Sequence, residues 1–210
     1  MGQGSKTLAG SRDSVPCGVK GQRPLRLPQV KENNDVGIVL KPVAPSGLEE
    51  PVAAVIREEV APYVDSIETD ALGNLICVKN GTEANPEKIM LSAHMDHIGY
   101  IVTGIEKEGF LRVTNVGGIS PTMSLTRHVS FPNGVQGVVV SEVSKDTTMK
   151  DLFVDIGAQD KADAETMVQI GDVCVYANDC FQLGANRVAS PAMDDRAACA
   201  LLIRFLQTVG

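Results

Sequence analysis

The 210-residue sequence predicts an α/β protein that is interrupted by a β-rich insert. Three observations support this fold class. Residues 37–103 mix helical and strand-like apolar patterns, residues 104–180 form short β-like runs between turn signals, and residues 181–210 return to a helical pattern. Insertions are tolerated where the two ends of the inserted domain lie close together, so a β domain within an α/β domain is physically reasonable.

Composition and charge exclude several classes of protein. Residues 1–31 hold six Lys/Arg against one Asp, a net charge of +5, so the remainder carries −12. An acidic body argues against nucleic acid as a partner. No apolar run reaches the ~18 residues of a membrane span, and no signal-peptide pattern is present. The five cysteines are scattered without a C-x-x-C pair, which predicts reduced thiols in a cytoplasmic protein.

Residues 1–36 are rich in Gly, Ser, Pro, Lys and Arg and have no apolar periodicity. They predict a disordered basic extension. An organelle transit peptide, which is basic and poor in acids, stays open as an alternative. An artefact of an upstream start codon is another.

The first α/β segment contains one helix and three strands by its local patterns. Ser46 to Glu49 has the spacing of a helix capping box, and apolar residues recur at helical spacing as far as Val60. Two strands are predicted on either side of a Gly73-Asn74 turn, at 66–70 and 75–78. Lys88 to Ala93 is nearly continuously apolar, which predicts a strand covered on both faces.

The insert and the final segment are simpler. Short β-like runs predict a small barrel or sandwich, interrupted by one helix over 161–168. Apolar residues from Ala198 to Leu206 predict a last helix over about 195–207. Neither a Gly-rich phosphate loop nor a G-x-S-x-G motif occurs.

Two clusters carry residues that can perform chemistry. His94 and Asp96 follow the predicted strand at 88–93, and side chains two apart on a strand face the same side. A histidine with a nearby carboxylate is the usual pairing in zinc sites. Asp194 and Asp195 precede the last helix, where one carboxylate can bridge two metals.

Spacing alone leaves a structural alternative open for each cluster. His94 can be a hydrogen-bonded core histidine beside a capping Asp96. Asp194 or Asp195 can be the N-cap of the last helix, with Arg196 as a solvated residue of its first turn.

Five segments, in order, resemble the M42 family of metallo-aminopeptidases, which includes tetrahedral glutamyl and deblocking aminopeptidases. The resemblance spans about Leu40 to Gly210 and rests on these segments: "APSGLEEPVAAVIREEVAPYVDSIETDALGNLICVKNG", "IMLSAHMDHIGYIV", "GFLRVTNVGGISP", "DLFVDIGA" and "SPAMDDRAACALLI". It implies a zinc-peptidase-like α/β sheet flanked by helices, with an inserted PDZ-like β-barrel used for dimerisation. It also implies that the C-terminal part of the α/β domain is missing.

The resemblance also assigns site residues. His94 matches a metal-binding histidine, Asp194 matches the carboxylate that bridges two metals, and Asp96 matches the acidic residue that supports the catalytic site beside the histidine ligand. A cis peptide often joins the residues matching Asp194 and Asp195. The implied cofactors are two divalent metal ions, with zinc or cobalt as the leading candidates, and the implied reaction is two-metal hydrolysis. Peptides would be the substrates, and a homo-oligomer built from dimers the expected assembly.

Two departures from the family pattern matter. His97 stands where these enzymes usually carry an acid; it can tune the site or add a stray ligand, and it touches no assigned role. The family's general base and its other metal ligands lie downstream of the Asp-Asp-Arg helix, beyond Gly210. We therefore expect the 210-residue chain alone to be inactive.

The alternative is a non-catalytic assembly or binding module based on the inserted β domain. A glycoside hydrolase is a weaker third hypothesis, because no isolated pair of catalytic carboxylates is evident.

Overall fold

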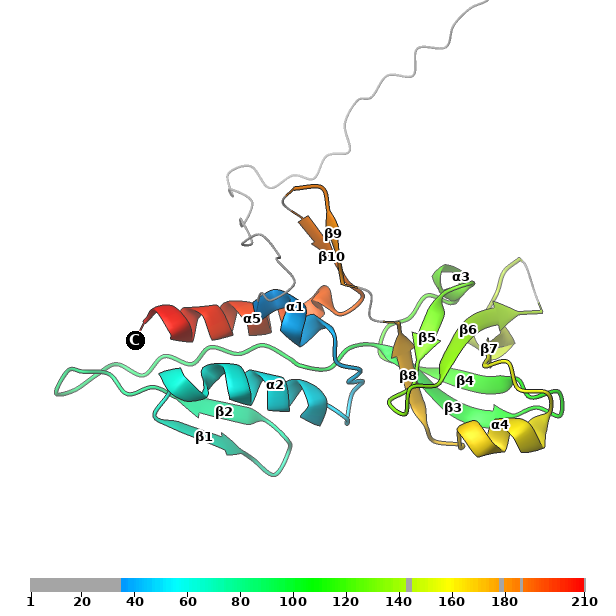
Figure 1. Cartoon of the computed structure of the whole chain (residues 1–210), viewed down its shortest axis with the longest axis horizontal. Coiled ribbons are helices and arrows are strands. Elements are labelled where there is room, and N and C mark those ends of the chain that lie inside the picture. The colour runs from blue at the N-terminus through cyan, green and yellow to red at the C-terminus, as the bar shows by residue number, and fades with distance from the viewer. Residues whose placement is uncertain (1–34, 143–144, 178–179, 186, 210) are drawn as a thin grey trace, which may run out of the picture.

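The computed structural model describes residues 35–142, 145–177, 180–185 and 187–209. A group of three helices with two hairpins lies beside a closed β-barrel (Figure 1). The predicted disordered extension lies outside the described residues up to residue 34. Its last two residues fall in helix α1 (Asp35–Leu40), which the sequence did not predict. None of the helices in the described ranges is long and apolar enough to cross a membrane.

The helices of the α/β part pack around one apolar core. Helix α2 (Glu50–Val60) holds Pro51 in its first turn, where a proline is tolerated. Helix α5 (Met193–Thr208) confirms the predicted C-terminal helix. A short 3-10 helix, η1 (Ala61–Tyr63), follows α2. The fully buried residues of this core come from α1, α2 and α5 and their flanks: Val39, Leu40, Val60, Ala192, Ala200 and Ile203.

The predicted hairpin is confirmed. Strands β1 (Ser66–Thr69) and β2 (Leu75–Val78) pair antiparallel, with Thr69 opposite Leu75. The Asp70 carboxylate accepts hydrogen bonds from the main chain of Leu72 and Asn74. Gly73 has a φ of +87°, a conformation that glycine adopts without strain. The turn is therefore built by local chemistry, as the sequence predicted.

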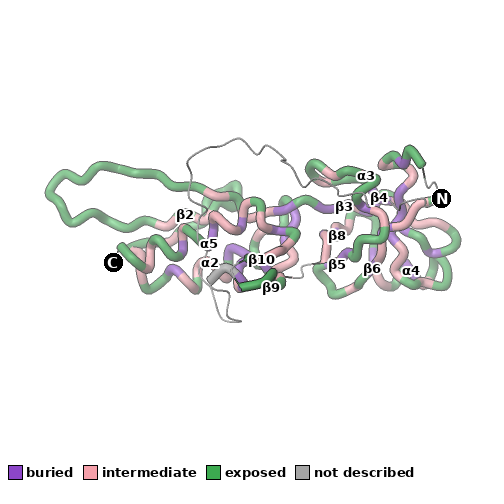
Figure 2. The backbone as a smooth tube through the Cα atoms, turned by 90° about the horizontal axis from the view of Figure 1, so that it is seen from above, coloured by how far each residue is buried: buried purple, intermediate pink, exposed green. Residues whose placement is uncertain are grey.

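The predicted strand at Lys88–Ala93 is wrong. No strand or helix occurs between residues 79 and 96, and the side chains of Ile89 and Met90 are 81% and 90% exposed. Figure 2 shows most of the segment between β2 and β3 as an exposed loop. A strand covered on both faces needs neighbouring strands and helices, and no other described segment pairs with this one.

The predicted sheet flanked by helices is consequently not formed among the described residues. In the α/β part, β1 and β2 form one two-stranded sheet. A second hairpin, β9 (Phe181–Leu183) with β10 (Arg187–Ala189), was not predicted from the sequence. It projects away from the helices (Figure 1).

The predicted β-barrel is confirmed as a closed, six-stranded barrel with the strand order β3-β4-β7-β6-β5-β8. Its strands are β3 (Gly99–Ile105), β4 (Leu111–Val116), β5 (His128–Ser130), β6 (Gln136–Ser141), β7 (Leu152–Asp155) and β8 (Val173–Tyr176). The short helices α3 (Pro121–Ser124), η2 (Met149–Asp151) and α4 (Lys161–Met167) connect them, and α4 confirms the predicted helix. The expected domain boundary between residues 103 and 104 falls inside β3.

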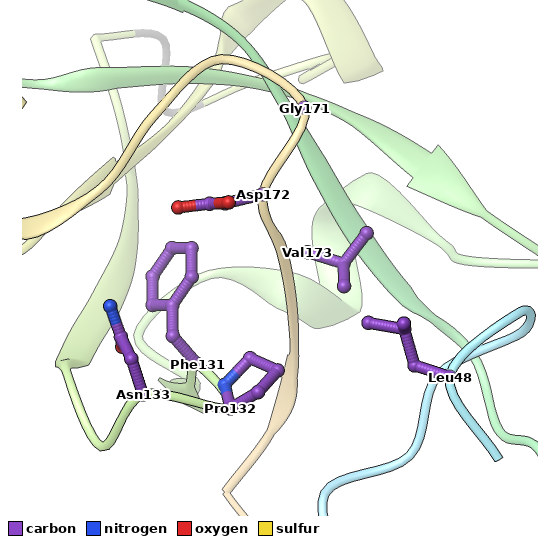
Figure 3. A pocket seen from close by; sticks show the side chains of 7 residues that line it. All are labelled: Leu48, Phe131, Pro132, Asn133, Gly171, Asp172 and Val173. Carbon is purple, nitrogen blue, oxygen red and sulfur yellow. The ribbon is translucent and has the colours of Figure 1, made fainter. Parts of the chain in front are cut away.

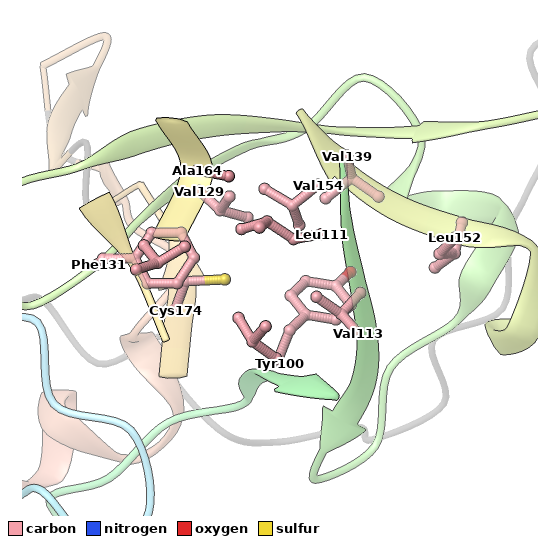
Figure 4. Close-up of a cluster of buried hydrophobic side chains, with 12 residues drawn as sticks. Tyr100, Leu111, Val113, Val129, Phe131, Val139, Leu152, Val154, Ala164 and Cys174 are labelled. Carbon is pink, nitrogen blue, oxygen red and sulfur yellow. The ribbon is translucent and has the colours of Figure 1, made fainter. Parts of the chain in front are cut away.

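Apolar side chains fill the barrel (Figure 4). They alternate along the strands with outward-facing residues, as the two-residue period of a strand requires. The buried members of this core are Tyr100, Leu111, Val113, Val129, Phe131, Val139, Leu152, Val154 and Cys174, with Val102, Ala164 and Val168. Closure leaves the barrel without an unpaired sheet edge.

The chain enters and leaves the barrel at one place. The first strand, β3, pairs with the last strand, β8, so that Gly99 lies opposite Val175. A Cβ atom at Gly99 would lie 2.4 Å from the carbonyl oxygen of Cys174, so the close approach of the two strands requires glycine. This closure returns the chain to the region of residues 94–97, where α5 begins.

Candidate metal centre

Three predicted site residues meet at the start of α5. Nε2 of His94 lies 3.1 Å from Oδ1 of Asp194, although the two residues are 100 positions apart. Nδ1 of His94 lies 3.1 Å from Oδ1 of Asp96 and 3.2 Å from its carbonyl oxygen. His94 therefore stands between two carboxylates. The barrel, which returns the chain to its entry point, makes this meeting possible.

The two aspartates at the start of α5 have non-helical backbone angles, and the peptide bond between them is cis, as the resemblance implied. The Asp194 side chain is 95% exposed. No side chain caps the first residues of α5 at Ala192. Because Asp194 and Asp195 lie at a kink between two helical pieces, the alternative in which one of them caps the helix that follows stays a prediction.

Arg196 holds the histidine segment against the helices. Its side chain is fully buried, so the alternative of a solvated first-turn residue is wrong. Its guanidinium donates from Nε to the Met95 carbonyl at 2.8 Å, and from Nη1 and Nη2 to the carbonyls of Pro42 at 2.6 Å and Ala44 at 3.2 Å. These bonds join the segment after α1 to the main chain between His94 and Asp96.

Cys199, one turn further along α5, adds a contact to the same segment. Its thiol donates to the carbonyl oxygen of His94 at 3.3 Å. Burial raises the pKa of this thiol to about 11, so it stays protonated and can donate. Cys199 and Arg196 together hold the consecutive carbonyls of His94 and Met95, and sequence reasoning missed both roles.

Ser46 completes a chain of polar groups. Its hydroxyl donates to Oδ2 of Asp96. The predicted capping box at residues 46–49 is wrong, because no side chain caps α2. The site thus runs from Ser46 through Asp96 and His94 to Asp194, and the capping-box pattern concealed the first member.

The electrostatics of the site follow from these contacts. Partial burial alone would lower the pKa of His94, but hydrogen bonds with Asp194 and Asp96 outweigh it and raise the pKa. The Ser46 hydroxyl is the largest cause that lowers the pKa of Asp96, and His94 adds to it. Asp96 is therefore held ionised, as a carboxylate that orients a histidine must be.

His97 lies beside the site and does not join it. Its side chain is buried, with 3% of its surface exposed, and neither ring nitrogen has a hydrogen-bond partner in the described structure. Burial, assisted by the charge of Arg196, lowers the pKa of His97 to about 4. The ring is thus neutral at pH 7 and fills space as a core side chain.

The donor atoms of His94 and Asp194 are of the kinds that zinc and cobalt accept. Two converging donors fit part of a metal site. Within the described ranges, however, no group of three His, Cys, Asp or Glu side chains lies close enough to hold a metal ion. A catalytic zinc normally keeps three protein ligands, so further ligands are required.

A shallow pocket of about 240 Å³ lies between the two parts of the molecule (Figure 3). Leu48 lines it from the segment that follows Ser46, and the rest of its lining comes from barrel residues 131–133 and 171–173. None of the candidate metal-site residues lines this pocket. We assign it no chemistry.

Known proteins resemble this chain over most of its length. The family model of the M42 glutamyl aminopeptidases matches residues 73–210. A provisionally named aminopeptidase of Acetivibrio thermocellus is 41% identical over 169 residues, which are 79% of this chain and 50% of that protein.

Two solved structures share the fold. An aminopeptidase of Desulfurococcus kamchatkensis superposes with a TM-score of 0.77 at 33% identity, over 82% of this chain and 50% of that one. The TET1 peptidase of Pyrococcus horikoshii, which can assemble into a tetrahedron or a large octahedral shell, gives a TM-score of 0.73 at 32% identity. The match covers 83% of this chain and 56% of that one.

The chain thus spans about half the length of the curated relatives it matches. The family model matches most of the sequence, and the solved structures share the fold. These two findings establish the family of this chain. The chain belongs to the M42 family of glutamyl aminopeptidases.

Proposed function

We propose that the chain is the N-terminal portion of a metal-dependent aminopeptidase that removes residues from the amino terminus of peptides. One observation carries the proposal: Nε2 of His94 and Oδ1 of Asp194 meet at 3.1 Å from opposite sides of the barrel insertion. A 100-residue separation makes such a meeting a property of the tertiary fold. Both side chains are accessible, as ligands of a catalytic metal must be.

Each residue has a distinct role in this proposal. His94 would hold one metal ion through Nε2, and the Asp194 carboxylate would hold the two ions together. Asp96 accepts a hydrogen bond from Nδ1–H of His94 and orients the ring. Two divalent ions, zinc or cobalt, when bound supply Lewis acidity and a water of lowered pKa.

The 210-residue chain alone is inactive under this proposal. The described residues provide two converging ligands instead of the three that a catalytic zinc keeps. The missing ligands and the general base would come from sequence outside these 210 residues.

The first test is the intact mass of the native protein, purified from its own cells. A mass well above 22.3 kDa, the mass of this chain, identifies a longer gene product. That product should release amino-terminal residues from peptides, and a chelator should abolish the release. Asp194→Ala should do the same, whereas Asp172→Ala, in the barrel, should leave the rate within about twofold. A longer product without metal-dependent release would refute the proposal.

The second candidate is a non-catalytic assembly module based on the barrel. Two observations favour it: the barrel closes on itself with its own core, and the similar Pyrococcus horikoshii peptidase forms large shells. A native mass at or below 22.3 kDa, with a monodisperse dimer in solution, would select this function. In either case we propose a cytoplasmic homo-oligomer with the dimer as its unit.

A further inference from the structure

The Ser46 hydroxyl is used by the site and not by helix α2. It lies close to the N-terminus of that helix, where serine is a favoured cap. Yet α2 has no side-chain cap, and the hydroxyl donates to Oδ2 of Asp96 instead. Its contribution must therefore be sought in what Asp96 does.

Asp96 presents its other oxygen to His94. A carboxylate that is held at Oδ2 cannot rotate freely, so Ser46 fixes the position of Oδ1. That oxygen and the Asp96 carbonyl lie 3.1 Å and 3.2 Å from Nδ1 of His94. Both are acceptors, so a proton on Nδ1 satisfies them.

The opposite ring nitrogen faces a competitor. Nε2 of His94 lies 3.1 Å from the Asp194 carboxylate, which is also an acceptor and favours a proton on Nε2. The neutral ring can satisfy only one side. The Asp194 side chain is 95% exposed and that of Asp96 33%, so water competes much more strongly for Asp194. The hydrogen bond from Ser46 to Asp96 therefore decides which ring nitrogen of His94 keeps the proton.

We propose that Ser46 is a positioning residue that, through Asp96, keeps the proton of neutral His94 on Nδ1 and leaves Nε2 free to bind a metal. Only the use of Nε2 as a ligand rests on the proposed function. The hydrogen-bond chain and its effect on the tautomer belong to the protein without metal.

The test is ¹⁵N NMR of the histidine rings in the metal-free 210-residue chain. Spectra are recorded at about pH 9, well above the ordinary histidine pKa of ~6.5, and the His94 signals are assigned with His94→Gln. In the unmodified chain, Nδ1 should resonate in the range of a protonated nitrogen and Nε2 in that of an unprotonated one. Ser46→Ala should lower the ratio of the two tautomers about fivefold, the effect of one ordinary hydrogen bond of ~1 kcal/mol.

Matched variants separate the hydroxyl from the shape of the side chain. Ser46→Thr keeps a hydroxyl and should restore the tautomer, whereas Ser46→Val, of nearly the same shape, should behave like Ala. Ser66→Ala, at an exposed serine of β1, should change nothing. The Thr and Val pair also covers the case in which the Ala variant folds poorly.

Unchanged ring signals in Ser46→Val would overturn the proposal. So would a loss of helical circular dichroism in that variant with the tautomer unchanged, since the hydroxyl would then act as a cap. Failure of the proposed function would show elsewhere, as absent metal-dependent peptide hydrolysis by the longer gene product. That result would leave the tautomer measurement standing.

Discussion

The barrel and the α/β part differ in how much of their main chain is paired in sheets. In the barrel, β3 pairs with β8 and closes the sheet, so every strand has two neighbours. In the α/β part, residues 79–96 run without strand pairing and expose Ile89 and Met90. The candidate site lies at the end of this unpaired segment. Its geometry therefore depends on a few long-range hydrogen bonds rather than on a sheet.

Arg196 supplies the most important of these bonds, and its loss should have the largest effect. Arg196→Met leaves the carbonyls of Met95, Pro42 and Ala44 without their buried donor, at ~1–3 kcal/mol for each unsatisfied group. We expect a loss of about 4 kcal/mol or more from the α/β part. Hydrogen exchange should rise over residues 35–44 and 93–97 while barrel residues 99–176 stay protected.

Arg204→Met is the control, because this exposed residue lies on the same helix and bonds Gln207 within it. Equal deprotection of the barrel in Arg196→Met would show that the two parts unfold as one unit.

The reverse experiment addresses the barrel. Leu111 is fully buried in its core, so Leu111→Ala should cost about 2–5 kcal/mol, the usual range for a buried leucine. Denaturant unfolding followed by segment-resolved hydrogen exchange should locate this loss between residues 99 and 176. Increased exchange at residues 93–97 of similar size would mean that the barrel also stabilises the site.

The buried His97 gives the α/β part a pH dependence. Its pKa is about 4 in the folded chain and ~6.5 when unfolded, so the unfolded chain binds more protons below pH 6.5. The stability from neutral His97 is complete above pH ~6.5 and is lost as the pH falls toward 4, by up to about 3 kcal/mol. Arg196 and Asp96 are the charged groups that act on it.

His97→Gln should flatten the dependence of unfolding free energy on pH between 6.5 and 4, relative to the unmodified chain. His128→Gln, at an exposed position of β5, is the matched control and should leave the curve in place. A steep curve that persists in His97→Gln would contradict the assignment.

The smallest effect is expected in the unpaired segment. Ile89→Ala should change the unfolding free energy by less than about 0.5 kcal/mol, because the side chain is 81% exposed. The same substitution in a longer gene product tests whether other sequence covers the segment. A cost of several kcal/mol there, but not in the 210-residue chain, would show that it does.

Local pattern explains what could be predicted. Alternating apolar residues and turn signals predicted the barrel, the hairpin around Gly73 and helix α4, because strand period and turn chemistry act over a few residues. The order of motifs pointed to His94, Asp96 and Asp194. That these three meet rests on the closure of the barrel, which the sequence only suggested.

The tertiary structure alone decided the rest, because burial and partner choice depend on groups far away in the chain. Lys88–Ala93 has the composition of a buried strand, but composition cannot supply the neighbours that a strand needs. Arg196 and Ser46 each sit where a local role is common, in a helix's first turn and before a helix. Both instead bond residues at least 50 positions away in the chain. Arg196 finds buried main-chain carbonyls, and Ser46 finds the charged carboxylate of Asp96.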